Sequence, residues 1–150
     1  MPAPTIEQTK VAAGAIASMG EADFLLRRRS EAGDTLIAYF VILARKLFAE
    51  DAAEQTAQRV EMMLASWFLR GEVEGKKAAP TDPAAAKKAV EKVAALDGAG
   101  LGQRMNAEVG DAILAFFTAF QHKTMPETDP DRRARAVQLM ILAYLLRGDL

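Results

Sequence analysis

Apolar residues recur every three or four positions along most of this 150-residue chain. That spacing places apolar side chains on one face of an α-helix, whereas a half-buried strand alternates apolar and polar residues with a period of two. Short segments rich in glycine, proline and aspartate interrupt the pattern, and such segments are typical of helix ends and turns. The sequence therefore predicts an all-α protein, a bundle of about six helices.

Two of these helices begin at recognisable capping residues. One helix is predicted at about residues 6–19, with Thr5 as its N-cap, and another at about residues 83–96, with Asp82 as its N-cap. Asp82 is the stronger of the two caps, because it precedes a proline and proline suits the first helical position.

The central helix of each half carries most of the aromatic residues. In the second half an unbroken apolar stripe runs from Leu101 to Phe120 at three- and four-residue spacing. The corresponding stripe of the first half, from Phe24 to Leu43, is broken at Arg28, where the second half has Met105. Stripes of this width indicate helices that face a core.

The last helix of each half is predicted at about residues 52–70 and 131–147. We interpret Arg70-Gly71 and Arg147-Gly148 as the ends of these helices. A cation in the last turn and a glycine just beyond it both suit a helix C-terminus.

The two halves of the chain match each other at an offset of 77 residues, with Gly33-Asp34 over Gly110-Asp111. Amphipathic helices share a period and so resemble one another by chance. However, Gly-Asp and Arg-Gly-acid recur at the same offset on both sides of the helices. The tripeptide Ala3-Pro4-Thr5 also recurs as Ala79-Pro80-Thr81, one residue out of register. Whether the Gly-Asp pairs lie inside long helices or begin shorter ones stays open.

We therefore predict two tandem, pseudo-symmetric three-helix repeats, residues 1–74 and 82–150, joined by a linker at residues 75–81. Units of this size bury too little surface to be stable alone. We expect the repeats to pack on each other about a pseudo-two-fold axis as one globular domain, in the manner of a fused homodimer.

Composition excludes several classes of function. The chain has 19 Lys and Arg against 20 Asp and Glu, so no global field attracts nucleic acid or an anionic membrane. It has no cysteine, which excludes disulfides and thiolate metal sites. No apolar run has the length of a membrane span, and the first residues do not resemble a signal peptide. We expect a cytoplasmic protein without membrane insertion.

Residues that could support catalysis or metal binding are few. His122 is the single histidine and has no evident nucleophile, carboxylate or metal-ligand partner in the sequence. Glu31 and Asp34, with Glu108 and Asp111, form matched acidic pairs that could hold a metal between helices, but the Glu-x-x-His pattern of such bundles is absent. Capping, or pairing with Arg70 and Arg147, is the favoured interpretation of these acids. We expect no catalytic residue, no cofactor and no metal.

Surface differences between the halves indicate where a partner would bind. The only dense basic cluster is Arg27-Arg28-Arg29. At the corresponding positions the other half has Arg104-Met105-Asn106, and it has His122 in place of Arg45. Arginines can contact phosphates or an acidic protein, although flanking acids also fit a solvated face. We predict that Arg27, Arg28, Arg29, Arg45 and His122 contact a partner.

The favoured function is a non-enzymatic adaptor, scaffold or regulatory protein whose partner is another protein, with homo-oligomerisation as a further option. One alternative is a ligand-sensing bundle that holds a small apolar molecule between the repeats, and another is weak nucleic-acid binding through Arg27–Arg29. The ligand-sensing alternative predicts an apolar groove formed by six aromatic residues: Tyr39, Phe40, Trp67, Phe116, Phe117 and Tyr144.

Overall fold

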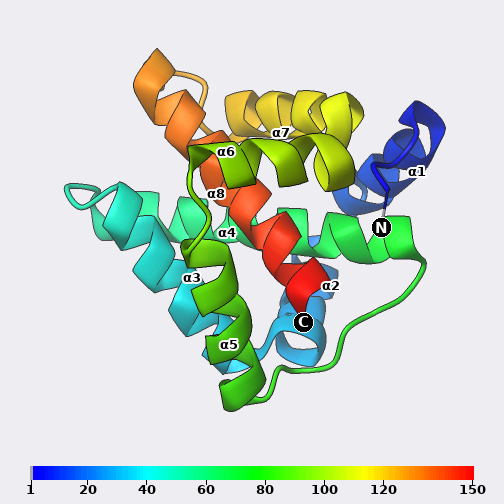
Figure 1. Cartoon of the computed structure of the whole chain (residues 1–150). Helices are drawn as coiled ribbons and strands as arrows, with labels where there is room; N and C mark the ends of the chain where they lie inside the picture. The colour runs from blue at the N-terminus through cyan, green and yellow to red at the C-terminus, as the bar shows by residue number, and fades with distance from the viewer. Residues whose placement is uncertain (1) are drawn as a thin grey trace.

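The computed structural model describes residues 2–150, and every element in that range is helical, as the sequence predicts (Figure 1). Six helical stretches result when each π-helical segment is counted with the helices beside it. In chain order the elements are α1 (Ile6–Ala17), α2 (Glu21–Arg27), the π-helical η1 (Arg28–Ala32), α3 (Gly33–Leu47), α4 (Ala53–Glu74), α5 (Pro83–Ala94), α6 (Gly98–Arg104), the π-helical η2 (Met105–Val109), α7 (Gly110–Thr124) and α8 (Pro130–Asp149).

The two longest helices, α4 and α8, cross at the centre of the molecule (Figure 1). They are 22 and 20 residues long, or about 30 Å each at 1.5 Å per residue. Their buried side chains concentrate in the C-terminal half of each helix and include Trp67, Phe68, Tyr144 and Leu145. The core of the protein is therefore built on this crossing.

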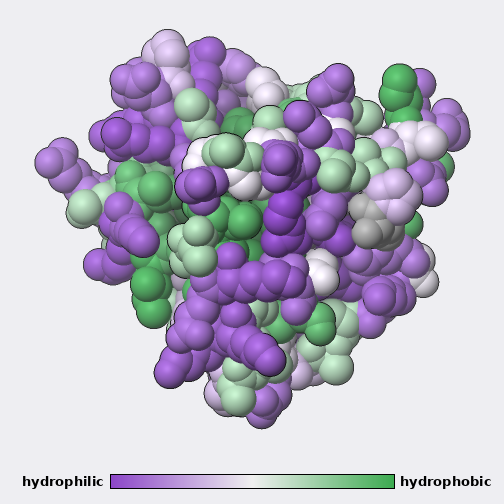
Figure 2. Space-filling model, viewed as in Figure 1, coloured by the Kyte–Doolittle hydropathy of each residue, from purple (hydrophilic) through white to green (hydrophobic). Residues whose placement is uncertain are grey.

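The shorter helices close the core by packing across the two halves of the chain. Helix α1 lies against α4 and α7, while α5 lies against α8 and α3 (Figure 1). One continuous hydrophobic cluster contains residues from both halves. Polar side chains cover much of the face in view, and apolar side chains gather over α3 (Figure 2).

Corresponding elements of the two halves begin 77 residues apart. This offset relates α1 to α5, α2 to α6, η1 to η2, α3 to α7, and α4 to α8. The two predicted N-caps, Thr5 and Asp82, are also 77 residues apart. The side chain of Thr5 accepts a hydrogen bond from the backbone N–H of Gln8, and that of Asp82 accepts one from the backbone N–H of Ala85.

Gly33 and Gly110 begin α3 and α7, which answers the question that the sequence left open. Their φ angles of 76° and 74° lie in the left-handed region that favours glycine. A Cβ atom on Gly33 would lie 3.1 Å from Cβ of Pro80, and one on Gly110 would lie 2.8 Å from Cβ of Ala3. Ala3 and Pro80, which contact the two glycines, are 77 residues apart. The two Ala-Pro-Thr tripeptides begin 76 residues apart, so their identical residues do not occupy corresponding positions.

The predicted helix ends at Arg70-Gly71 and Arg147-Gly148 are wrong. Helix α4 continues to Glu74, and α8 continues to Asp149. Both glycines lie within a helix. Glycine is required at these positions because any side chain would meet an arginine of the other helix. A Cβ atom on Gly71 would lie 2.5 Å from Nη2 of Arg147, and one on Gly148 would collide with the guanidinium of Arg70.

We predict that Gly71→Ala lowers the free energy of unfolding by about 1–3 kcal/mol, because the added methyl group displaces the buried guanidinium of Arg147. Gly14→Ala is the control, since nothing lies within 4 Å of a Cβ atom there. It should stabilise the protein by about 0.5–1 kcal/mol through helix propensity alone. Urea denaturation followed by circular dichroism measures both changes. Equal stabilisation by the two substitutions would contradict close packing at the crossing.

Candidate binding groove

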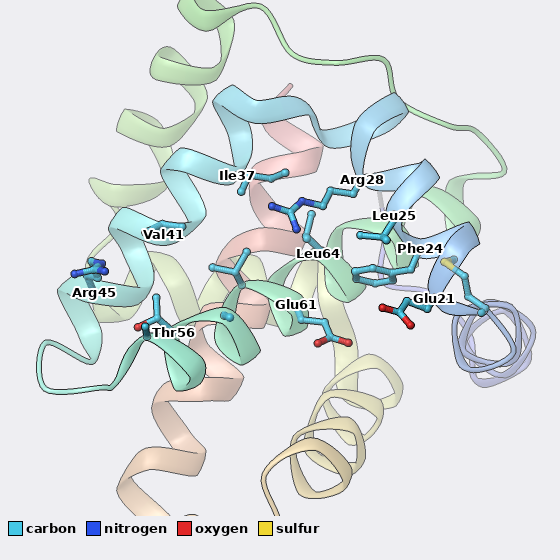
Figure 3. A pocket seen from close by; sticks show the side chains of 15 residues that line it. Glu21, Phe24, Leu25, Arg28, Ile37, Val41, Arg45, Thr56, Glu61 and Leu64 are labelled. Atoms are coloured by element: carbon cyan, nitrogen blue, oxygen red, sulfur yellow. The ribbon is translucent and has the colours of Figure 1, made fainter.

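A half-open groove of about 730 Å³ lies between α2, α3 and the N-terminal half of α4 (Figure 3). Its wall on α4 is formed by residues at three- and four-residue spacing between Ala53 and Leu64, which place one face of the helix along the groove. The apolar side chains that line it are Met19, Phe24, Leu25, Ile37, Val41, Val60 and Leu64. The span from Ala53 to Leu64 corresponds to about 17 Å, or three helical turns.

The bend at Gly33 positions the opposite walls. Because α2 and η1 meet α3 at this glycine, Phe24 and Leu25 face the groove from one helix while Ile37 and Val41 face it from the next. Ile37 and Val41 lie four residues apart on α3, so they share one side of that helix.

Four charged side chains also line the groove: Glu21, Arg28, Arg45 and Glu61. None of them forms an ion pair within residues 2–150. Arg45 lies toward one end of the groove and Glu21 toward the other, while Arg28 extends toward the middle (Figure 3). The groove therefore has an apolar interior, and its two ends carry charges of opposite sign.

Three exposed apolar side chains lie on the helices that form this groove. Leu25 and Leu26 on α2 are 47% and 66% exposed, and Ile42 on α3 is 59% exposed. Each of these residues lines the groove or is adjacent in sequence to a residue that does. Of the three, Leu25 lines the groove, whereas Leu26 and Ile42 each point about 100° away from the lining residue that precedes them.

A second groove of about 470 Å³ lies on the other half of the molecule, against α6, α7 and α8. It is lined by Leu101, Thr118, Gln121, Arg133, Ala134, Val137, Gln138 and Ile141. Every one of these residues except Gln121 lies 77 positions after a residue that lines the first groove. The two grooves are thus formed by corresponding positions of corresponding helices.

A network of buried and partly buried ion pairs joins the two halves. Nε of Arg27 lies 2.6 Å from Oε1 of Glu31, and Nη1 of Arg104 lies 2.7 Å from Oδ2 of Asp149. Three longer pairs of this network connect the halves: Arg70 with Glu108 at 3.4 Å, Arg147 with Glu31 at 3.5 Å, and Arg147 with Glu74 at 3.9 Å. Glu31 and Glu108 therefore pair with Arg147 and Arg70, as the sequence predicts. Asp34 and Asp111 take no part in the ion pairs of residues 2–150 and are exposed.

The arginines of the network also stack on buried aromatic rings. The guanidinium carbon of Arg70 lies 4.8 Å from the centre of the Tyr144 ring, and that of Arg147 lies 5.3 Å from the Trp67 ring. Such contacts stabilise a cation that burial has removed from water. Burial raises the pKa of Tyr144 to about 12, and the nearby charge of Arg70 lowers it only in part.

The predicted partner-binding residues separate into three groups. Arg28 and Arg45 line the first groove. Arg29 and His122 are exposed but line neither groove. Arg27 differs from the expectation of a surface cation, because it is 8% exposed and bound to Glu31 and to a second carboxylate, Glu72. Pairing across the fold, which a linear sequence does not display, explains its burial.

The predicted aromatic residues do not gather around one cavity. Phe40, Trp67, Phe117 and Tyr144 are fully buried, whereas Tyr39 and Phe116 are partly buried on other faces of α3 and α7. Phe40 packs edge-to-face on Trp67 at 6.2 Å, and Phe117 does the same with Tyr144 at 6.1 Å. These rings form the core, and none of the six lines the first groove.

The groove residues that the sequence did not indicate are Phe24, Ile37, Val41 and Leu64. They lie at the edges of the apolar stripes, where exposure depends on how neighbouring helices are placed. The sequence feature that could have indicated this groove is Arg28, because a charged residue within the apolar stripe of the first half implies that this part of the stripe reaches solvent.

The fold and the grooves define an all-α helical bundle with two related surface clefts. Comparisons with protein-family models, with characterised proteins and with solved structures give no match for this chain. Within residues 2–150, no helix is long and apolar enough to cross a membrane. The same part of the chain has no cluster of three or more His, Cys, Asp or Glu side chains arranged to hold a metal ion.

The ion-pair network makes the stability of the protein depend on pH. Burial alone would raise the pKa of Glu108, but hydrogen bonds and charge from Arg104 and Arg70 outweigh it and lower the pKa below 4.5. A lowered folded-state pKa contributes stability that is complete above the unfolded value and is lost as the pH falls through the folded value. We predict that Glu108→Gln lowers the urea midpoint at pH 7 and that its difference from the wild type shrinks near pH 2.

Glu127→Gln is the control for this prediction, because Glu127 is exposed and forms no ion pair within residues 2–150. Its urea midpoint should follow that of the wild type at both pH values. A Glu108→Gln protein with an unchanged midpoint at pH 7 would show that the network contributes no stability through this carboxylate.

Proposed function

We propose that this protein is a non-enzymatic helical adaptor, which binds an amphipathic helix of a partner protein in the groove between α2, α3 and α4. The observation that carries the proposal is the combination of an apolar groove about three helical turns long with unpaired charges along its edges. Helix-in-groove recognition uses an apolar stripe as the anchor and flanking charges for selectivity.

The extent of the apolar surface favours a protein partner over a small molecule. Leu25 lines the groove and is 47% exposed, so a ligand confined to the cavity would leave part of this side chain in water. A helix of about three turns would contact the whole row of α4 residues from Ala53 to Leu64. The volume also falls within the range of small-molecule sites, about 300–1,000 Å³, so a ligand-sensing bundle is the second candidate.

Charge gives the bound helix a direction. The C-terminus of a helix carries a partial negative charge and the N-terminus a partial positive charge. The favourable arrangement places the C-terminal end of the partner helix beside Arg45 and its N-terminal end beside Glu21, which lie toward opposite ends of the groove (Figure 3). Acidic residues in the last turn of the partner helix would strengthen the contact with Arg45.

We also propose that the chain is an internally duplicated, fused-dimer-like protein whose halves are related by a pseudo-two-fold axis. The support is the constant offset of 77 residues between element boundaries, between the left-handed glycines Gly33 and Gly110, and between the two grooves. Duplication would give two equivalent surfaces, and later substitution would let each take a different occupant.

A synthetic peptide tests the adaptor proposal directly. The probe is a fluorescent, stapled amphipathic helix of about 14 residues, with leucines along one face and glutamates in its last turn. Ala57 lines the first groove and is exposed, so Ala57→Trp should fill the groove and weaken binding at least about tenfold in fluorescence anisotropy. Ala134→Trp at the corresponding position of the second groove is the matched control and should leave the affinity unchanged.

The direction of the helix has its own pair of variants. Arg45→Glu should weaken the same peptide about threefold to tenfold, with a smaller effect at high salt, because an attraction becomes a repulsion. His122→Glu changes the corresponding exposed residue of α7 and should have no effect. Absence of peptide binding, or equal weakening by Ala57→Trp and Ala134→Trp, would refute the groove as a helix site.

A further inference from the structure

Arg28 is the charged side chain that lies toward the middle of the first groove. It is four residues after Phe24, so the two side chains share one side of the helix that α2 and η1 form, and both line the groove. Figure 3 shows the guanidinium of Arg28 extending among the side chains of the groove, whereas Arg45 and Glu21 lie toward its ends. A cation therefore lies where the rest of the interior is apolar.

No carboxylate of residues 2–150 forms an ion pair with Arg28. The neighbouring Arg27 is buried and bound to Glu31, and Arg29 is exposed and lines neither groove. Of the three consecutive arginines, Arg28 thus presents its charge to the groove.

Two carboxylates line the same groove without neutralising this charge. Glu21 and Glu61 are exposed, and Figure 3 shows both carboxylates directed away from the guanidinium of Arg28. Arg28 itself is partly exposed, so water can solvate its charge while the groove is open.

A helix laid in the groove would remove that water from Arg28. A cation that loses water without gaining a partner destabilises the complex, and a leucine opposite the guanidinium offers no acceptor. A carboxylate at that position would accept hydrogen bonds from the guanidinium, and such charge-assisted pairs are among the strong ones. Because Arg28 lies toward the middle of the groove, the residue at the centre of the bound helix faces it in either direction of the helix.

The other half of the chain has methionine at this position. Met105 lies 77 residues after Arg28 and, like it, is the first residue of a π-helical segment. Its side chain packs against the hydrophobic core and does not line the second groove. The backbone is therefore the same in both halves, and the difference lies in the side chain.

We propose that Arg28 is the specificity-determining residue of the first groove, and that the partner helix has one glutamate or aspartate at the centre of its apolar stripe. This inference rests on the proposed adaptor function and adds the chemistry of the partner. A fatty acid would also offer a carboxylate to Arg28. However, the charges of Arg45 and Glu21 suit the two ends of a helix, and a fatty acid has one charged end only.

The test compares three versions of the stapled peptide on the full chain by fluorescence anisotropy. They have leucine, glutamine or glutamate at the centre of the apolar stripe, and the staple keeps all three helical. We expect the glutamate version to bind at least about tenfold more tightly than the other two. The glutamine version separates the effect of charge from that of polarity.

A substitution with a matched control assigns this preference to one side chain. Arg28→Met should reverse the preference, so that the leucine version binds at least about tenfold more tightly than the glutamate version. The variant should fold normally, as circular dichroism will verify, because Arg28 forms no ion pair and methionine occupies the corresponding position at Met105. Arg29→Met removes the same charge from the adjacent exposed position and should keep the preference for glutamate.

The results separate this inference from the adaptor function. Equal binding of the leucine and glutamate versions to the unaltered protein, with Ala57→Trp still blocking both, would overturn the role of Arg28 and leave the adaptor function standing. No binding of any version would refute both. Loss of the preference in Arg29→Met as well as in Arg28→Met would overturn the inference in favour of a general attraction between charges. Displacement of the glutamate version by micromolar decanoate would overturn it in favour of a fatty acid.

The comparison of the three peptides on the unaltered protein requires no substitution. It therefore tests the inference even where Arg28→Met fails to fold.

Discussion

The reciprocal contact between two arginines and two glycines at the crossing of α4 and α8 is the constraint on which the rest of the structure depends. Each guanidinium occupies the space that a side chain would take on the other helix, at Gly71 and Gly148. The arginines are then held by carboxylates from the opposite half, Glu31 and Glu108. Buried ion pairs of this kind add little net stability, but a mismatched partner is costly, so they fix the register of the crossing.

This constraint also places the grooves. Because η1 and η2 carry the carboxylates that bind the arginines of the crossing, the helices that follow them begin at fixed positions. Gly33 and Gly110 then turn the chain at left-handed backbone angles, and α3 and α7 continue beside α4 and α8. Each groove is the space that remains on the outer side of this arrangement.

Local features of the fold could be predicted from the sequence, and contacts between distant residues could not. Thr5 and Asp82 are recognisable caps because capping depends on neighbours three residues away. The same local logic made Arg70-Gly71 resemble a helix end, whereas its glycine is required by an arginine far along the chain. The apolar stripes place Trp67 and Tyr144 on buried helix faces, and the groove that the ligand-sensing alternative predicts for them is absent, since apolar periodicity does not distinguish a core face from a cleft.

The short helices α1 and α5 each bridge the two halves, and the segment that connects the halves does so as well. Helix α1 packs on α4 of its own half and also on α7, and α5 packs on α8 of its own half and also on α3. Residues 75–82 also take part in this packing: the backbone carbonyl of Lys76 accepts a hydrogen bond from Nη2 of Arg147, and Pro80 lies beside Gly33. A change in the length of this segment would therefore have to keep both contacts while still joining the two halves, so the segment is part of the packing as well as a tether.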